Sequence, residues 1–307
     1  MSDFTVDKSV LPLQLARLGD SRNVEECRSI IAHLLELMEI DRAEIVRVLD
    51  IFDDVHSLYS GEFPGYKSCD TEYHDFRHVI DVTLASLRIS DALMLDGEKF
   101  SLHNIFLVTI AAIFHDTGYI PEKDDPVENG AVYTSTHVRR SMVFAEKYMS
   151  ERGYSAEDIE KTTEIILLTD LSVKLADIEF FDAETERFAK ILASADLIGQ
   201  MADRIYLEKL LFLYREFQTG NIPFYSSEED LLTKTIGFFK IMEDRLTSIL
   251  DGVNDKLVLH FRKRYDIDED LYRKGMNNNL AYLIKILDEH PGHHREFLRR
   301  DNMVKKL

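Results

Sequence analysis

Two histidines stand four residues apart in the stretch YHDFRHVIDVT, residues 73–83. On a helix, His74 and His78 would project from one face with their rings about 6 Å apart. A histidine pair at this spacing is more often an ordinary part of a helix surface or core than half of a metal site. Whether this pair binds a metal therefore depends on the groups that other segments bring to it.

Two further segments carry metal-binding side chains in apolar surroundings. His115 and Asp116 come directly after the apolar run AAIF, and Asp196 interrupts the apolar run ILASADLIGQMAD. Burying an unpaired carboxylate is costly, and a divalent cation is the strongest compensating group. Two histidines with two carboxylates would suit zinc, manganese or iron, and a second, mostly water-ligated ion would be magnesium or manganese. The sequence thus predicts a metal centre built from three segments.

The elements that must position these groups are predicted to be helices. The chain has only 13 glycines and 6 prolines in 307 residues, and no alternating strand pattern with hairpin signals. Capping boxes predict three helix starts, at Asn23 with Glu26, Asp41 with Glu44, and Ser226 with Glu229. The apolar run 104–114 is shorter than the roughly 20 residues of a membrane helix and is predicted to be a buried core helix. The predicted fold class is all-α.

Composition and charge limit the expected partners. The 37 basic and 56 acidic residues give a net charge of -19, which would repel a nucleic-acid backbone, and no basic stripe with interleaved aromatics is present. An anionic small substrate would need a local cation to reverse the field. Cys27 and Cys69 lack a C-x-x-C spacing, so no disulfide framework is expected and a reducing cytoplasm is favoured. Neither a secretory signal nor a membrane segment is expected.

The chain is interpreted as one helical domain with two flanking parts. Residues 1–60 are predicted to form an N-terminal helical extension packed on the main domain, residues 61–290 the catalytic domain, and residues 291–307 a polar C-terminal tail. Residues 60–70 and 117–131 are rich in Gly, Pro and acidic residues and are predicted to be loops beside the histidine-bearing segments. The sequence leaves the oligomeric state, including a homodimer, open.

The order of these motifs resembles the HD-domain metal-dependent phosphohydrolases and, more specifically, the catalytic domain of the class I cyclic-nucleotide phosphodiesterases. The stretch YHDFRHVIDV is similar to the family's Y-H-N-x-x-H-A-x-D-V. EIILLTDLSVKL (residues 164–175), SADLIG (194–199) and TKTIGFF (233–239) resemble three further family motifs in the same order. The matches run from Tyr73 to Phe239, about half of the chain. The resemblance implies an all-α, HD-type multi-helix bundle that hydrolyses a phosphoester.

The resemblance also assigns roles to the predicted metal-binding side chains. It implies that four of them hold the first metal ion: His78, His115, Asp116 and Asp196. Asp116 would also bridge to the second ion. His74 would protonate the leaving oxygen, a task that suits a histidine with a pKa of about 6.5. His137 and Glu128 resemble second-metal or neighbouring site residues of related enzymes. A solvated His137 beside two arginines is an equally good reading, and the register at Glu128 is not fixed.

Two positions depart from the phosphodiesterase pattern. The family has H-D-x-x-H, whereas the fifth residue here is Tyr119, whose phenol offers a hydrogen bond where the family has an imidazole. Lower or altered activity is therefore expected. The base-reading glutamine of the family falls on Thr235 and its stacking aromatic on Phe238, so the choice between cAMP and cGMP is open. Phe238 is equally well explained as a core aromatic of an amphipathic helix.

The favoured function is hydrolysis of a cyclic nucleotide 3',5'-phosphodiester to the 5'-monophosphate by a cytoplasmic enzyme. One alternative is an HD-type phosphohydrolase that acts on nucleotide monophosphates or other phosphoesters. Another is a degenerate module that only binds a nucleotide or a protein partner. The presence of His74 beside a complete set of metal-binding side chains argues against the last, because a module that only binds needs no proton donor at a metal site.

Overall fold

The computed structural model describes residues 14–307 and is all-α over this range. The α-helices are α1 (Val24–Leu37), α2 (Arg42–Ser60), α3 (Phe76–Leu95), α4 (Leu102–Phe114), α5 (His137–Glu151), α6 (Ala156–Leu167), α7 (Ala183–Ala202), α8 (Tyr206–Thr219), α9 (Glu228–Ser248), α10 (Leu257–Tyr265), α11 (Leu271–Glu289) and α12 (His294–Phe297). Short 3-10 helices lie at Leu15–Arg17, Thr117–Tyr119, Gly130–Tyr133, Leu175–Asp177, Val253–Lys256 and Arg300–Lys306. The described residues contain no β-strand beyond an isolated bridge between Tyr66 and Glu122. The prediction of an all-α chain is confirmed.

Two of the three predicted helix starts are in place, and the third is displaced by one residue. The Asn23 side chain accepts a hydrogen bond from the Glu26 amide and begins α1, while Asp41 accepts from Ala43 and begins α2. Helix α9 begins after Ser227 and not after Ser226, because the Ser227 hydroxyl accepts from the Asp230 amide. Each of these caps satisfies an amide that would otherwise lack a partner.

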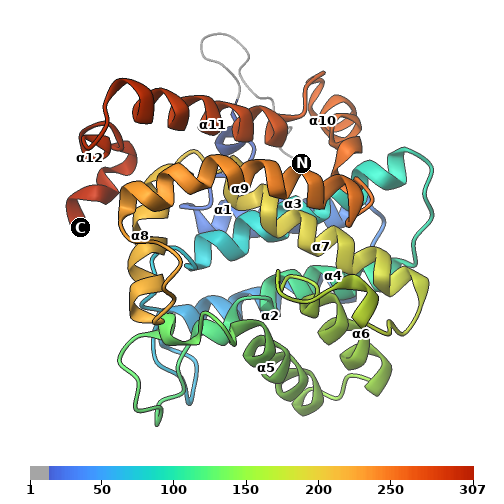
Figure 1. Ribbon diagram of the computed structural model, residues 1–307. Helices are drawn as coiled ribbons and strands as arrows, with labels where there is room; N and C mark the ends of the chain where they lie inside the picture. Colours follow the sequence, from blue (N-terminus) through green and yellow to red (C-terminus); the bar gives the residue numbers. More distant parts are fainter. Residues whose placement is uncertain (1–13) are drawn as a thin grey trace.

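Helices α3 and α7 pack on each other through the middle of the molecule, with α4, α5 and α6 on one side and α10 and α11 on the other (Figure 1). The predicted core helix is α4, where every residue from Asn104 to Phe114 is buried. In the described residues no helix is long and apolar enough to cross a membrane. Most residues of α3, α4 and α7 are buried, so the predicted metal-binding side chains lie on buried helices or directly after one.

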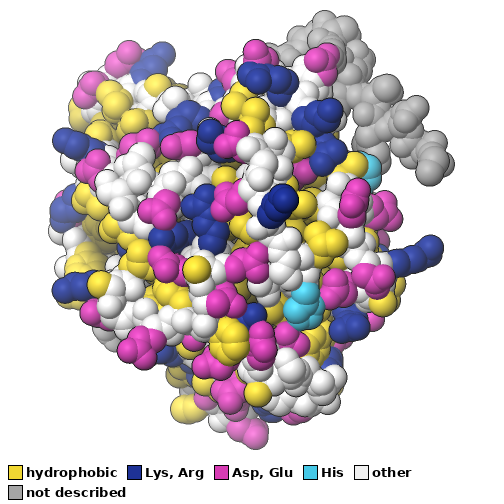
Figure 2. Space-filling view, turned by 90° about the vertical axis from the view of Figure 1, so that its right-hand side faces the viewer, with side chains coloured by type: hydrophobic (Ala, Val, Ile, Leu, Met, Phe, Trp, Pro, Cys, Tyr) yellow, Lys and Arg dark blue, Asp and Glu magenta, His cyan; other side chains and the backbone are white. Residues whose placement is uncertain are grey.

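The two flanking parts pack on the main domain. Helices α1 and α2 share its core, where Leu34 and Val55 are almost completely buried. Residues 1–13 lie outside the described residues. The expectation of no secretory signal concerns these residues and is not tested by the structure. At the other end, Leu298 is fully buried, so the segment predicted as a polar tail folds back onto the helices. Figure 2 shows one face of the molecule, where acidic and basic side chains are interspersed without a broad basic area.

Candidate metal centre

The first histidine pair straddles the start of a helix. Helix α3 begins at Phe76, and its N-cap Asp75 accepts a hydrogen bond from the His78 amide. His74 therefore precedes the helix, whereas the sequence predicted both histidines on it. The separation of the rings, 6.0 Å between centroids, nevertheless agrees with the prediction. This arrangement points His78 into the interior at 3% exposure and leaves the His74 side chain more open, at 13%.

His115 and Asp116 directly follow helix α4, as predicted, and His115 is its C-cap. His115 donates from Nδ1 to the Ala112 carbonyl oxygen (2.8 Å), which leaves its Nε2 facing the cluster. The chain then turns at Gly118, where a Cβ atom would lie 2.0 Å from the His137 carbonyl oxygen. Only glycine allows this close approach, which brings the start of α5 against Asp116. The local sequence thus places His115 and Asp116 as potential ligands, and Gly118 allows the start of α5 to pack beside them.

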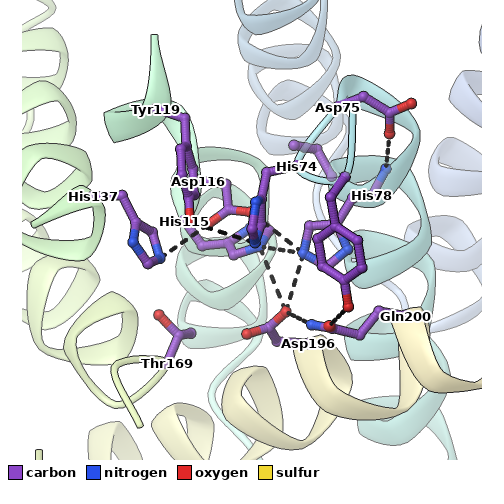
Figure 3. A network of polar contacts seen from close by, with 12 residues as sticks. His74, Asp75, His78, His115, Asp116, Tyr119, His137, Thr169, Asp196 and Gln200 are labelled. Carbon is purple, nitrogen blue, oxygen red and sulfur yellow. Dashed lines mark hydrogen bonds and ion pairs between the residues drawn. The ribbon is translucent and has the colours of Figure 1, made fainter. Parts of the chain in front are cut away.

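Asp196 reaches the same point from helix α7, and the four side chains converge (Figure 3). His78 Nε2 lies 3.3 Å from His115 Nε2, 3.4 Å from Asp116 Oδ2 and 3.1 Å from Asp196 Oδ1. His115 Nε2 lies 3.5 Å from Asp116 Oδ2 and 3.9 Å from Asp196 Oδ1. Segments that are far apart in the sequence therefore contribute atoms to a single small volume.

These separations suit one metal ion. Two ligand atoms, each about 2.1 Å from an ion, lie roughly 3.0–3.5 Å apart in octahedral or tetrahedral coordination. Three of the four side chains, His78, His115 and Asp116, form a buried group that could hold a metal ion. Asp116 Oδ2 is buried and has no hydrogen-bond partner among the described residues. A buried carboxylate oxygen without a donor is costly, so a cation is the natural complement of this group.

The charges of the two carboxylates are set by the surrounding imidazoles. Burial raises the pKa of Asp116, but His115, His74 and His78 outweigh burial and hold that pKa well below its ordinary value of 3.8. Burial likewise raises the pKa of Asp196, and a hydrogen bond and charge from His78 bring it below its ordinary value. Both carboxylates are therefore ionised at neutral pH, which is the form that binds metal.

His74 is held by a carboxylate that the sequence did not single out. Glu216 of α8 is 5% exposed; its Oε2 lies 2.7 Å from His74 Nδ1, and its Oε1 accepts from the Tyr73 amide at 2.7 Å. Burial lowers the pKa of His74, but the charge and hydrogen bond of Glu216 more than compensate and raise it above 6.5. His74 therefore stays protonated to a higher pH than a free histidine. Because Nδ1 is bound to Glu216, Nε2 is the ring nitrogen on the other side.

Tyr119 lies between two imidazoles. Its ring stacks on His74 at 4.2 Å and on His137 at 4.4 Å between centroids, and its hydroxyl lies 3.5 Å from His74 Nε2. His137 donates from Nδ1 to the Thr134 carbonyl oxygen, and its Nε2 lies 3.6 Å from Asp116 Oδ1. Burial lowers the pKa of His137, which favours the neutral form that acts as a ligand. His137 thus borders the cluster and is not a freely solvated side chain.

Three of the predicted site residues lie outside this cluster. Glu128 is exposed on the loop before Gly130. The Thr235 hydroxyl is buried and donates to the Leu231 carbonyl oxygen within its own helix, so its single proton is already used. Phe238 is partly buried and packs against the hydrophobic core. Helix α9 therefore offers no free hydrogen-bond donor from Thr235 for a nucleotide base.

A second residue that the sequence analysis did not identify, Gln200, orients Asp196. One turn along α7, its Nε2 donates to Asp196 Oδ1 at 2.9 Å, while its Oε1 accepts from the Tyr73 hydroxyl at 2.5 Å (Figure 3). Residues that orient a metal ligand in this way commonly contribute a factor of about 10–100 to metal affinity. The one sign of this role in the sequence is that Gln200 stands four residues after Asp196, one helical turn away.

Replacing this amide tests the arrangement. We expect Gln200→Ala to weaken metal binding by roughly 10–100-fold, because Asp196 loses the donor that fixes its orientation. The measurement is the metal dissociation constant from competition with a chelator. Gln218→Ala, at an exposed position on α8, is the matched control and should leave the constant unchanged. Equal affinities in all three proteins would mean that Gln200 does not position a ligand.

Comparison with known proteins gives one partial match. The family model described as Npun_R2479-like matches residues 125–242, less than half of the chain. His137, Asp196, Gln200 and Glu216 lie inside the matched stretch, whereas the two histidine-bearing segments around α3 and the end of α4 precede it. A comparison with curated proteins found no match. From the loop before α5 into helix α9, the chain is thus similar to the Npun_R2479-like family.

Proposed function

We propose that the chain is a metal-dependent phosphohydrolase of the HD type. The observation that supports this best is the convergence of four side chains, in which the Nε2 atoms of His78 and His115 lie 3.1–3.9 Å from each other and from oxygens of Asp116 and Asp196. His74, bound to Glu216, lies beside them. A divalent cation bound there would polarise a phosphoryl oxygen and ease the deprotonation of water. It would also offset the net charge of -19, which otherwise repels an anionic substrate.

The chain's own side chains supply the rest of the chemistry. His74, with Nδ1 bound to Glu216, donates a proton from Nε2 to the ester oxygen that leaves phosphorus when water attacks from the opposite side. Glu216 holds the ring in place and keeps it protonated. Tyr119 packs flat against the same ring and fixes its plane. The bond from phosphorus to the leaving oxygen breaks as the water oxygen bonds to phosphorus, and the leaving oxygen becomes a hydroxyl that carries the proton from His74. A cyclic diester thus opens to a monoester, and a monoester gives phosphate and an alcohol. The proton that the attacking water loses balances the one that His74 gives up.

The first substrate class to test is a cyclic nucleotide, whose 3',5'-phosphodiester would be opened to a 5'-monophosphate. A second candidate, hydrolysis of phosphomonoesters such as nucleotide monophosphates, is favoured by one observation. Thr235 has a hydroxyl in place of the side-chain amide with which the phosphodiesterases read a base, and this hydroxyl already donates within its own helix. Both candidates use the same metal centre and differ in how the rest of the substrate is bound.

The two candidates are separated by assaying the purified chain with manganese or magnesium against cAMP, cGMP and a panel of nucleotide monophosphates. Turnover of a cyclic nucleotide supports the diesterase, and turnover of the monoesters alone rejects it in favour of the second candidate. His115→Ala is the control for contaminating phosphatases, because it removes a proposed ligand. If the chain retains no transition metal and no added metal raises its melting temperature, both enzyme proposals fail and a binding module is left.

A further inference from the structure

A cavity of about 370 Å³ lies where the segment around Gly19, helices α3, α7 and α11, and the turn at Arg300 meet. Its walls include none of the side chains of the metal centre, although α3 and α7 contribute to both. Its volume lies within the roughly 300–1,000 Å³ range of small-molecule sites. The cavity is therefore large enough for a metabolite and separate from the proposed catalytic residues.

Arg88, in the wall of this cavity, is a buried cation without a carboxylate partner in the described structure. It is 2% exposed, and its two terminal nitrogens donate to the Tyr272 hydroxyl (2.9 Å) and the Leu18 carbonyl oxygen (2.7 Å). Both acceptors are neutral, and the Arg88 Nε has no hydrogen-bond partner among the described residues. A buried charge that is balanced only by neutral groups is costly, so an anion beside it would be stabilising.

The rest of the wall is also unusually basic for this chain. It carries six basic side chains: Arg22, Arg77, Arg88, Arg204, Lys274 and Arg300. Its four acidic side chains are Asp20, Asp81, Asp203 and Asp301. Burial and the neighbouring Asp203 raise the pKa of Asp81, which reduces the negative charge of the wall further. Arg22 is paired with Asp20 and Asp301, and Lys274 with Glu269 beside the wall. In a chain with a net charge of -19, the wall still carries more basic than acidic side chains.

We propose that this cavity binds a small organic anion that carries phosphate or carboxylate groups. Guanidinium groups such as Arg88 pair with the oxygens of either group through parallel N–H donors. Leu15, Ala16 and Leu271 supply apolar wall for the carbon part of the ligand. The proposal does not depend on the metal centre or on its reaction.

The test is calorimetric titration of the full chain, after removal of metal with a chelator, at constant ionic strength in a zwitterionic buffer. Inorganic phosphate and citrate are the two probes, and the one with the lower dissociation constant identifies the favoured group. Lys274→Glu reverses a charge in the wall, while Lys285→Glu makes the same change on α11 outside the cavity, where the side chain is 62% exposed. Arg88→Met removes the buried cation itself.

We expect Lys274→Glu and Arg88→Met to raise the dissociation constant at least tenfold, and Lys285→Glu and His115→Ala to change it less than twofold. If Arg88→Met does not fold, as judged by circular dichroism, the pair of lysine variants still decides. Equal weakening by both lysine variants would mean general charge attraction and would overturn the proposal. A loss of binding in His115→Ala alone would place the anion at the metal centre and would also overturn the proposal. So would no binding of either probe at 10 mM, which is weaker than the roughly 1 μM–1 mM range typical of KM values.

Discussion

His74→Ala is expected to reduce turnover by roughly 10²–10⁴-fold, the usual contribution of a positioned proton donor, while the protein keeps its metal. The reason is geometric. His74 Nδ1 is bound to Glu216, and the ring lies beside the four converging ligand atoms without being one of them. Turnover is measured on the substrate class identified above, and metal content by elemental analysis. Metal loss equal to that of Asp196→Ala would instead make His74 a ligand.

Glu216→Gln separates positioning of His74 from the charge that acts on it. The single oxygen of glutamine can still accept the hydrogen bond of His74, at the expense of the one that Glu216 accepts from the Tyr73 amide. Without the carboxylate charge, the raised pKa of His74 should fall toward or below its ordinary value of 6.5. A proton donor is active below its pKa and is lost as the pH rises through it. The alkaline limb of the kcat profile should therefore move to lower pH in Glu216→Gln.

Glu146→Gln, at an exposed position on α5, is the matched control and should keep the wild-type profile. A uniform loss of kcat at every pH in Glu216→Gln would mean that Glu216 only supports the structure. An unchanged profile with unchanged kcat would show that His74 is not the proton donor in the rate-limiting step.

The sequence was sufficient for the all-α class and for the group His78, His115 and Asp116 that could hold a metal ion, because both depend on local patterns. The run before His115 is apolar on every face, so it had to be buried, and a charged pair at its end had to be compensated. The sequence analysis placed His74 on one helix with His78, whereas α3 begins at Phe76. Asp75 is a good N-cap residue, but its signal lay inside a stretch interpreted as a histidine pair on one helix.

The partners of these side chains could not be predicted, because their positions depend on tertiary packing. Glu216 is 142 residues from His74 in the chain, and nothing in the local pattern of α8 marks it as different from any other helical glutamate. The same limit applies to Thr235 and Phe238. A motif match gave their positions in the sequence, but only the packing of α9 determined that Thr235 is buried and donates within its helix.

Asp196→Ala is expected to abolish metal retention. The change removes the carboxylate whose Oδ1 lies 3.1 Å from His78 Nε2 and leaves three proposed ligands, His78, His115 and Asp116. Metal that binds only the folded state stabilises it by about 2.7 kcal/mol at a concentration 100 times the dissociation constant. Wild-type protein should therefore melt at a higher temperature when metal is added, and Asp196→Ala should not.

Asp177→Ala is the matched control for this variant, because it removes an exposed carboxylate from the turn before α7 and should keep both metal and the melting shift. Full metal retention by Asp196→Ala would exclude Asp196 as a ligand and leave the buried group His78, His115 and Asp116 as the whole site. Loss of metal in Asp196→Ala together with an unchanged fold would connect helix α7 to the centre directly. That connection matters most for the proposed function, since Asp196 is the one proposed ligand that lies within the family match.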